Sequence, residues 1–227
     1  MTNLVFKFKM CLAGDSGVGK SWFATINDKD YPIPTNESAA SDLYENSTIG
    51  IDLRNAVREH AMVARQSGNM ISCTAKHEVW DTAGQERFNS IVRSYFRNAD
   101  IVILFYSLVD KTTYDNLETR WIPMATTEVS GHRCQFFIIG TFADKLKENG
   151  GEMERVVSRK DAEILASEYK AGYFEIDSKR KGGLSSYQTF STISHLCCEN
   201  APDPIESQPT IIVVQNKTTT AKKKKKC

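Results

Sequence analysis

The chain has 227 residues, of which 41% are hydrophobic and 25% are charged, and its formal net charge at pH 7 is +1. This composition suits one well-buried domain with an additional tail, and it excludes a collagen-like fibre and a wholly disordered chain. The longest apolar runs, residues 101–106 and 136–139, are far too short to cross a bilayer. Lys7 and Lys9 interrupt the apolar stretch of residues 4–12, so we expect no signal peptide, a cytoplasmic protein and reduced cysteines.

The charge is unevenly distributed along the chain. Residues 201–227 contain six lysines against Asp203 and Glu206, a balance of +4, which leaves residues 1–200 with a balance of −3. A mildly acidic body with a basic tail is not typical of a groove-reading protein, so we expect no nucleic-acid partner. Prolines, polar residues and the lysine run predict that residues 201–227 form a disordered tail behind a single domain, residues 1–200.

Strand-like and helix-like segments alternate through the first 200 residues, which predicts an α/β fold with a largely parallel sheet. Apolar, β-rich runs predict strands at residues 4–13, 48–57, 71–80, 101–106, 136–139 and 173–176. Helical patterns occur at residues 21–26, 114–129, 159–169 and 187–199. Residues 31–46 are polar, contain two prolines and predict a loop.

Residues 14–21 match the pattern G-x-x-x-x-G-K-[ST] between a predicted strand and a predicted helix. Glycines let backbone N–H groups curl around phosphate oxygens, and the N-terminus of the following helix favours negative charge. We expect Lys20 to reach the terminal phosphates and the Ser21 hydroxyl to bind Mg²⁺. A glycine-rich turn without a ligand is the alternative. The other residues expected at the phosphates are Asp15, Ser16, Gly17, Val18 and Gly19.

A second segment, residues 80–88, has the sequence Trp-Asp-Thr-Ala-Gly-Gln-Glu-Arg-Phe. Asp81 ends a predicted strand and can hold Mg²⁺ through water, while the N–H of Gly84 can sense a terminal phosphate. An isolated D-x-x-G pattern occurs often by chance, but the nine-residue stretch at this distance from the glycine-rich loop is far more specific.

Both segments resemble those of small GTPases of the Ras superfamily, and with residues 48–52 and 94–99 they look most like the Rab branch. The resemblance covers about residues 4–200. It implies a P-loop GTPase fold with six mostly parallel strands flanked by helices, in which the second strand is antiparallel. Three connections, residues 22–47, 49–80 and 145–178, are longer than is usual in that family.

The resemblance also implies a function. Such a protein binds GTP or GDP with Mg²⁺, hydrolyses GTP slowly, and recruits effectors in vesicle traffic at the cytosolic face of intracellular membranes. Thr48 resembles the threonine that binds Mg²⁺ when the γ-phosphate is present, and Gln85 resembles the glutamine that orients the attacking water. An exchange factor, an activating protein and effectors would bind through the two switch regions.

The base-reading segments depart from the family. In place of Asn-Lys-x-Asp, residues 141–144 are Thr-Phe-Ala-Asp. The Asp144 carboxylate can accept hydrogen bonds from guanine N1–H and N2–H₂, a pair that adenine lacks, and the Phe142 ring can stack on the base; the alternative for Asp144 is an ordinary loop acid. In place of Ser-Ala-Lys the chain has Asp177, Ser178 and Lys179, and we expect the last two to keep their contacts with the base.

Two further sets of residues carry hypotheses. Leu53, Trp80 and Tyr95 stand where Rab proteins carry an aromatic triad that meets effectors, although both aromatic residues fit equally well in a core. His77 is in phase with apolar neighbours on its strand, which favours a core histidine over a ligand.

The tail combines an apolar run from Ile211 to Val214, the lysines at 222–226 and the terminal thiol of Cys227. The lysines would be attracted to an anionic membrane surface, and Cys227 is the candidate lipidation site. The apolar run resembles the segment by which Rab proteins engage their prenylation escort. Rab tails usually end in two cysteines, and the C-a-a-X pattern needs three residues after the thiol, so prenylation, palmitoylation and an unmodified thiol all stay open.

Two other functions fit parts of the sequence. A nucleotide-binding adaptor with weak base choice and little hydrolysis is favoured by residues 141–144 and disfavoured by Gln85 and Thr48. A P-loop kinase or ATPase would need a lid arginine cluster or a second acceptor pocket, and we find neither in the sequence.

Overall fold

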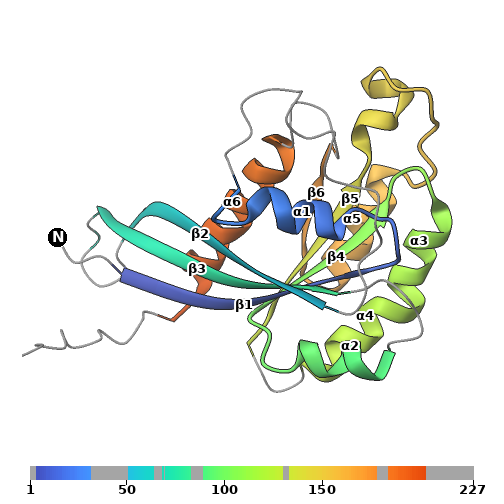
Figure 1. The fold of residues 1–227 in the computed structure, drawn as a ribbon. Coiled ribbons are helices and arrows are strands. Elements are labelled where there is room, and N and C mark those ends of the chain that lie inside the picture. Colours follow the sequence, from blue (N-terminus) through green and yellow to red (C-terminus); the bar gives the residue numbers. More distant parts are fainter. Residues whose placement is uncertain are drawn as a thin grey trace, which may run out of the picture.

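The computed structural model describes residues 4–31, 51–63, 68, 70–82, 89–129, 133–177 and 184–202. They form a six-stranded sheet in the order β2-β3-β1-β4-β5-β6 (Figure 1). The strands are β1 (Leu4–Gly14), β2 (Ile51–Val63), β3 (Met70–Thr82), β4 (Ile101–Ser107), β5 (Gln135–Thr141) and β6 (Gly172–Glu175). Only β2 runs antiparallel to its neighbour, and the pairs β3-β1, β1-β4, β4-β5 and β5-β6 are parallel. The predicted α/β fold is therefore confirmed.

Helices cover both faces of this sheet (Figure 1). On one face, α1 (Lys20–Asn27) and α6 (Leu184–Asn200) pack on the alternate residues of β1 that include Met10 and Leu12. On the other face lie α2 (Asn89–Phe96), α3 (Lys111–Asn116), the π-helical turn η3 (Leu117–Trp121), α4 (Ile122–Glu128) and α5 (Arg159–Glu168). No helix in the described residues is long and apolar enough to cross a membrane.

The central strand β4 shows why both layers are needed. All seven of its residues are buried, because helices cover it on both sides, and its continuous apolar run is typical of such a strand.

Short 3₁₀ turns, η4 (Ala143–Lys145) and η5 (Lys147–Asn149), follow β5. The helix α2 was not predicted, and the helix predicted at residues 114–129 runs from Lys111 to Glu128 with η3 in its middle.

Strands β1, β2 and β3 are long and extend together on the left of Figure 1. One face of this part packs on α6. His77 lies on that face with Cys73, Ala75 and Val79, and it is buried as predicted. The Ser194 hydroxyl lies 2.8 Å from His77 Nε2, and burial lowers the pKa of His77 to about 3, which keeps the ring neutral.

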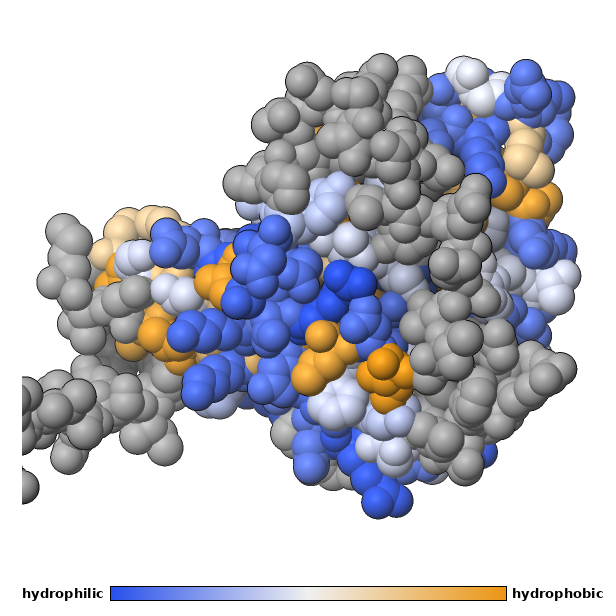
Figure 2. Space-filling model, in the orientation of Figure 1, coloured by the Kyte–Doolittle hydropathy of each residue, from blue (hydrophilic) through white to orange (hydrophobic). Residues whose placement is uncertain are grey.

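The opposite face of the three long strands mixes polar and apolar side chains, as the left part of Figure 2 shows. Its exposed large apolar residues include Val5, Leu53, Val57, Val63 and Met70.

Candidate functional site

The phosphate loop begins where β1 ends. Gly14 has φ 141°, and a Cβ at this position would lie 2.4 Å from the carbonyl oxygen of Phe105 on β4, so only glycine fits. Gly17 and Gly19 have φ values of 80° and 93°, a left-handed conformation that favours glycine. The path of the chain therefore requires glycine at position 14 and favours it at positions 17 and 19.

Helix α1 starts immediately after this loop, with Gly19 as its N-cap and Lys20 as its first residue. The first N–H groups of a helix have no partners within the helix, and with the helix dipole they form a binding site for an anion. The arrangement of strand, glycine-rich turn and helix N-terminus that the pattern requires is present.

Lys20 is the buried cation of this loop. Its side chain is only 5% exposed, and its Nζ donates hydrogen bonds to the carbonyl oxygens of Gly14 (2.9 Å) and Asp15 (2.7 Å). Burial lowers the pKa of Lys20 to about 8, against the opposing effect of the Asp81 and Asp15 carboxylates. The ammonium group is thus charged at neutral pH and held over the loop.

Asp81, at the end of β3, is brought next to this cation. It is 1% exposed, and burial raises the pKa of its carboxyl, while a hydrogen bond from Ser21 and the charge of Lys20 act in the opposite direction. An Asp carboxylate and a Ser hydroxyl are oxygen ligands of the kind that Mg²⁺ prefers. Residues from two motifs far apart in the sequence therefore meet at one polar, buried point that fits a divalent cation.

The base-facing side begins at the end of β5. Thr141 is buried, and its hydroxyl donates to the carbonyl oxygen of Tyr106 at 3.0 Å, so the side chain is directed into the sheet. A Cβ on Gly19 would lie 3.7 Å from Thr141 Cγ2, which places this strand end against the phosphate loop. Phe142 has φ 64°, a rare conformation for a large residue. Asp144 follows in the 3₁₀ turn η4.

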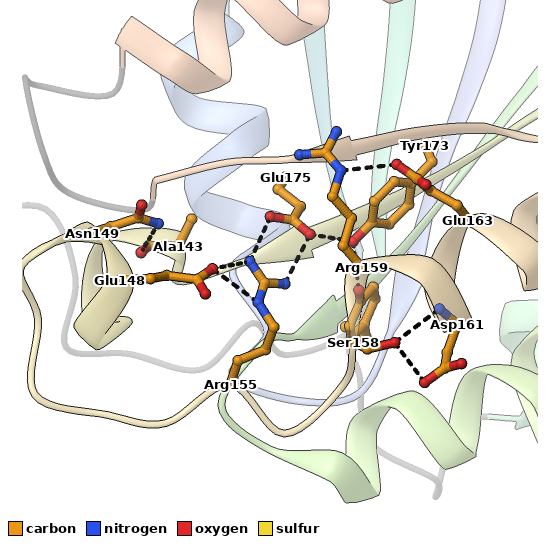
Figure 3. Close-up of polar contacts among 11 residues, drawn as sticks. Ala143, Glu148, Asn149, Arg155, Ser158, Arg159, Asp161, Glu163, Tyr173 and Glu175 are labelled. Atoms are coloured by element: carbon orange, nitrogen blue, oxygen red, sulfur yellow. Dashed lines mark hydrogen bonds and ion pairs between the residues drawn. The ribbon is translucent and has the colours of Figure 1, made fainter.

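An ion-pair network supports this side of the site (Figure 3). Arg155 binds Glu175 with two hydrogen bonds, from Nη1 at 2.9 Å and from Nη2 at 3.0 Å, and its Nε donates to Glu148 at 2.9 Å. Tyr173 donates to Glu175 at 2.7 Å. Burial alone would raise the pKa of Glu175, but the hydrogen bonds from Arg155 and Tyr173 hold it below its ordinary value.

The same network joins the two segments expected to face the base. Glu175 ends β6 just before residues 176–179, and Arg155 comes from the long connection after Asp144. Within that connection, Asn149 Nδ2 donates to the carbonyl oxygen of Ala143 at 2.9 Å. The N–H of Ala143 donates in turn to the carbonyl oxygen of Ile176 at 3.2 Å. Sequence reasoning missed Arg155 and Glu175. The sequence alone does not distinguish them from the other charged residues nearby, because their pairing depends on the folded chain.

Comparisons with known proteins agree with this geometry. The sequence model of the Ras family matches residues 9–199. The chain belongs to the Ras family. It is 33% identical over 187 residues to Ras-related protein Rab-26 of Rattus norvegicus, an alignment that covers 82% of this chain and 62% of that relative. It is 32% identical over 171 residues to Rab-37 of Homo sapiens, covering 75% and 65%, and 31% identical over 180 residues to SEC4 of Candida albicans (strain WO-1), covering 78% and 72%.

Within the Ras family the chain is a divergent Rab-like small GTPase. It spans about three fifths of the length of the mammalian Rab-26 relatives that it matches (62% for the rat protein).

Leu53, Trp80 and Tyr95, which the sequence analysis compared with the Rab aromatic triad, lie side by side. Leu53 on β2 pairs with Trp80 on β3, and the rings of Trp80 and Tyr95 have centroids 5.6 Å apart. Leu53 is 52% exposed, whereas Trp80 and Tyr95 are half-buried. The two aromatic rings pack on each other while Leu53 reaches the surface, and contact of this group with effectors stays a prediction.

Several expected site residues lie outside the described part of the chain. They are Thr48, Gly84, Gln85, Ser178, Lys179, Cys227 and the run from Ile211 to Val214. The described residues bring together Lys20, Ser21, Asp81 and the phosphate loop. Asp144 lies in η4, shortly after the strand end at Thr141 that adjoins this loop.

Proposed function

We propose that this chain is a Rab-like switch that binds GTP and GDP with Mg²⁺ and slowly hydrolyses GTP. The observation that carries the proposal is the meeting of Lys20, Ser21 and Asp81 beside a phosphate loop whose path requires glycine at position 14. Together they supply a cation, oxygen ligands and backbone donors, which are the parts that a triphosphate and its metal need.

Each residue has a role in this proposal. The backbone from Asp15 to Gly19 holds the phosphates, and Lys20 neutralises their charge. Ser21 and Asp81 hold Mg²⁺, joined by Thr48 when the γ-phosphate is present. The bound metal would supply positive charge to the phosphate oxygens during hydrolysis.

Hydrolysis itself is assigned to Gln85, which orients the attacking water, while Gly84 contacts the terminal phosphate through its N–H. Because the transition state is loose and its charge is spread over the phosphate oxygens, positioning and charge neutralisation by Lys20 do most of the work. An activating protein would supply further positive charge or a second polar side chain.

Guanine is read by fewer groups than in the family pattern. Asp144 accepts from the guanine N1–H and N2–H₂ groups, Phe142 stacks on the ring, and Ser178 and Lys179 contribute from the loop after β6. Since the Thr141 hydroxyl is directed to Tyr106, it does not replace an asparagine amide. This supports GTP binding that is weaker than usual for the family.

The test is the variant Gln85→Leu. We expect its affinity for GTP to stay near that of the parent and its single-turnover hydrolysis to be slower, because water positioning affects only the chemical step. Equal hydrolysis rates in parent and variant, with and without an activating protein, would remove Gln85 from this role.

One alternative keeps the nucleotide site and loses the enzyme. The Thr141 hydroxyl donates to the carbonyl oxygen of Tyr106 and is therefore not available to the base. This favours an adaptor that binds nucleotides with weakened base specificity and little or no hydrolysis. A parent protein that binds GTP but shows no hydrolysis above the rate in buffer supports this adaptor.

Membrane cycling is the remaining part of the proposal. A domain of residues 1–200 would carry the switch regions for exchange factor, activating protein and effectors, and the tail of residues 201–227 would carry the anchor. A lipid on Cys227 and the lysines at 222–226 would bind an anionic cytosolic leaflet together, since either alone is a weak anchor. The run from Ile211 to Val214 would engage a prenylation escort.

Cell fractionation tests the anchor. We expect Cys227→Ser to move the protein to the soluble fraction, and replacement of the lysines at 222–226 by Gln to weaken membrane recovery. Full membrane recovery of Cys227→Ser would contradict a lipid on this thiol, and a mass spectrum of the tail identifies any lipid that is present.

A further inference from the structure

The helix between β4 and β5 contains an irregular turn. Helix α3 passes at Asn116 into the π-helical turn η3, which ends at Trp121 and leads into α4. A π turn has hydrogen bonds from residue i to i+5, so each bond spans one residue more than in an α-helix. Such turns are rare and are often found at functional sites.

The turn changes which side chains share a face. In an α-helix, residues five apart differ by about 140° around the axis, because each residue turns the chain by about 100°. A π turn brings such residues nearly into line. Asn116 and Trp121 are five residues apart and stand at the two ends of this turn. We attribute the shared direction of their side chains to it.

Both side chains bind one carboxylate of the phosphate loop. Asn116 Nδ2 donates to Asp15 Oδ2 at 2.6 Å, and Trp121 Nε1 donates to Asp15 Oδ1 at 2.8 Å. Trp121 is fully buried, so its indole N–H is fixed by the surrounding core. Hydrogen bonds to an ionised carboxylate are stronger than bonds between neutral groups, and two donors from one turn hold the side chain of Asp15 in a single place.

Asp15 passes this restraint to the phosphate site. Its main-chain carbonyl oxygen accepts the hydrogen bond from Lys20 Nζ at 2.7 Å. The two donors also offset the negative charge of a carboxylate that belongs to an anion-binding loop. Arg120, in the same turn, stacks on the Trp121 ring with its Cζ 4.4 Å from the ring centroid, and so adds positive charge on this side.

We propose that Asn116 and Trp121 are positioning residues that retain the bound nucleotide by holding Asp15, and through it Lys20, in the geometry that binds phosphate. This inference rests on the proposed function, since it assigns these residues to the same nucleotide site. Both residues bind Asp15 of the loop, so we expect their effect to be on the rate of nucleotide release.

The experiment measures release of fluorescently labelled GDP from the Mg²⁺-loaded protein after addition of excess unlabelled GDP. Trp121→Phe keeps an aromatic ring and removes the N–H donor, and Asn116→Ala removes the other donor from a half-buried position. We expect each variant to release GDP roughly 10- to 100-fold faster, the range for loss of one hydrogen bond to a charged group. Thr119→Val is the matched control, because it removes a hydrogen bond from the same turn to the carbonyl oxygen of Asp115 and leaves both donors to Asp15 in place.

A double-mutant comparison separates positioning from general destabilisation. If Trp121 acts through Asp15, adding Trp121→Phe to Asp15→Ala causes no further acceleration of release. Acceleration by the same factor in both backgrounds, or release at the parent rate in both Trp121→Phe and Asn116→Ala, would overturn the proposal. A parent protein that retains GDP while its variants release it at the parent rate overturns this inference alone. A parent that binds no guanine nucleotide overturns the proposed function together with it.

Discussion

Residues 14–21 at the end of β1 keep every position of the phosphate-binding pattern, whereas residues 141–144 at the end of β5 keep only the final aspartate of the base-reading pattern. The two ends adjoin, since Gly19 faces Thr141. The phosphate end depends on backbone geometry, as the 2.4 Å approach of a Cβ at Gly14 to Phe105 demonstrates. Substitution there would displace the chain itself.

The base-facing end depends on side chains and tolerates their exchange. Here its two loops are joined by the Arg155–Glu175 pair and by the bonds among Ala143, Asn149 and Ile176. The comparison shows that the part of a site that binds through backbone groups depends on specific glycines and keeps its sequence pattern. The part that binds through side chains can use other residues for the same contacts. The predictions below compare the two ends in order of expected effect.

Lys20→Ala tests the phosphate end and should have the largest effect. The change removes the buried ammonium group that bonds Gly14 and Asp15, and with it the cation expected at the phosphates. We expect the affinity for GTP, GDP and ATP alike to fall by at least about 100-fold, the loss of two or more bonds to charged groups. Lys111→Ala, at an exposed ion pair with Asp115, should leave all three affinities unchanged. An effect confined to guanine nucleotides would contradict a role at the phosphates.

Asp144→Ala tests the base-facing end. We expect the affinity for GTP to fall by about 100-fold, because two hydrogen bonds to one carboxylate are lost, while the affinity for ATP stays the same. Equilibrium titration with labelled GTP and ATP measures both. The exposed carboxylate of Asp115 offers the control Asp115→Ala, for which neither affinity should change. If Asp144→Ala lowers the affinities for GTP and ATP equally, Asp144 does not distinguish guanine from adenine.

Arg155→Ala tests the support of the base-facing end. Arg155 and Glu175 are only 18% and 11% exposed, so the variant leaves a poorly solvated carboxylate without its counter-charge. We expect a loss of about 3 kcal/mol in the free energy of unfolding and a drop in GTP affinity of roughly 10-fold. Chemical denaturation and nucleotide titration measure the two effects.

Two variants sharpen this test. Arg155→Lys keeps the charge but cannot bind Glu175 with two parallel bonds, so it should recover only part of the loss. Arg159→Ala breaks a solvent-exposed pair with Glu163 and should cost about 0.5 kcal/mol or less. Full stability and GTP affinity in Arg155→Ala would contradict a supporting role for the network.

Phe142→Ala should have the smallest effect. Base–aromatic stacking contributes about 1–3 kcal/mol and does not depend on the base. We expect the affinities for GTP and ATP to fall together by about 5-fold, which corresponds to the lower end of this range. The titrations used for Asp144→Ala detect this pattern. A lower affinity for GTP alone would mean that Phe142 positions Asp144 and does not stack on the base.

The sequence predicted the sheet well because its central strands are continuous apolar runs, and β4 and β5 were found within one or two residues of their predicted ends. It predicted β2 to end at residue 57, whereas the strand continues to Val63. The reason is that buried charge interrupts the apolar pattern. Arg58 is stacked on Tyr187 and Phe190 and donates to Asn27, partners that only the folded chain provides.

The site was predictable to the extent that it depends on local sequence. The phosphate loop, Lys20, Ser21 and Asp81 were identified by motif, and the structure brings them together. The π turn and its contacts with Asp15 were not predicted, because a one-residue change in helical winding leaves no signal in propensity.

The measurement that tests the central comparison most directly is the affinity ratio for GTP and ATP in the parent protein, titrated after removal of bound nucleotide and in the same Mg²⁺ buffer. An intact phosphate end with an altered base-facing end predicts that both nucleotides bind measurably. The affinity for GTP should be roughly 5- to 150-fold lower than is usual for the family, yet still higher than the affinity for ATP. Equal affinities for GTP and ATP, or failure to bind either, would contradict the account.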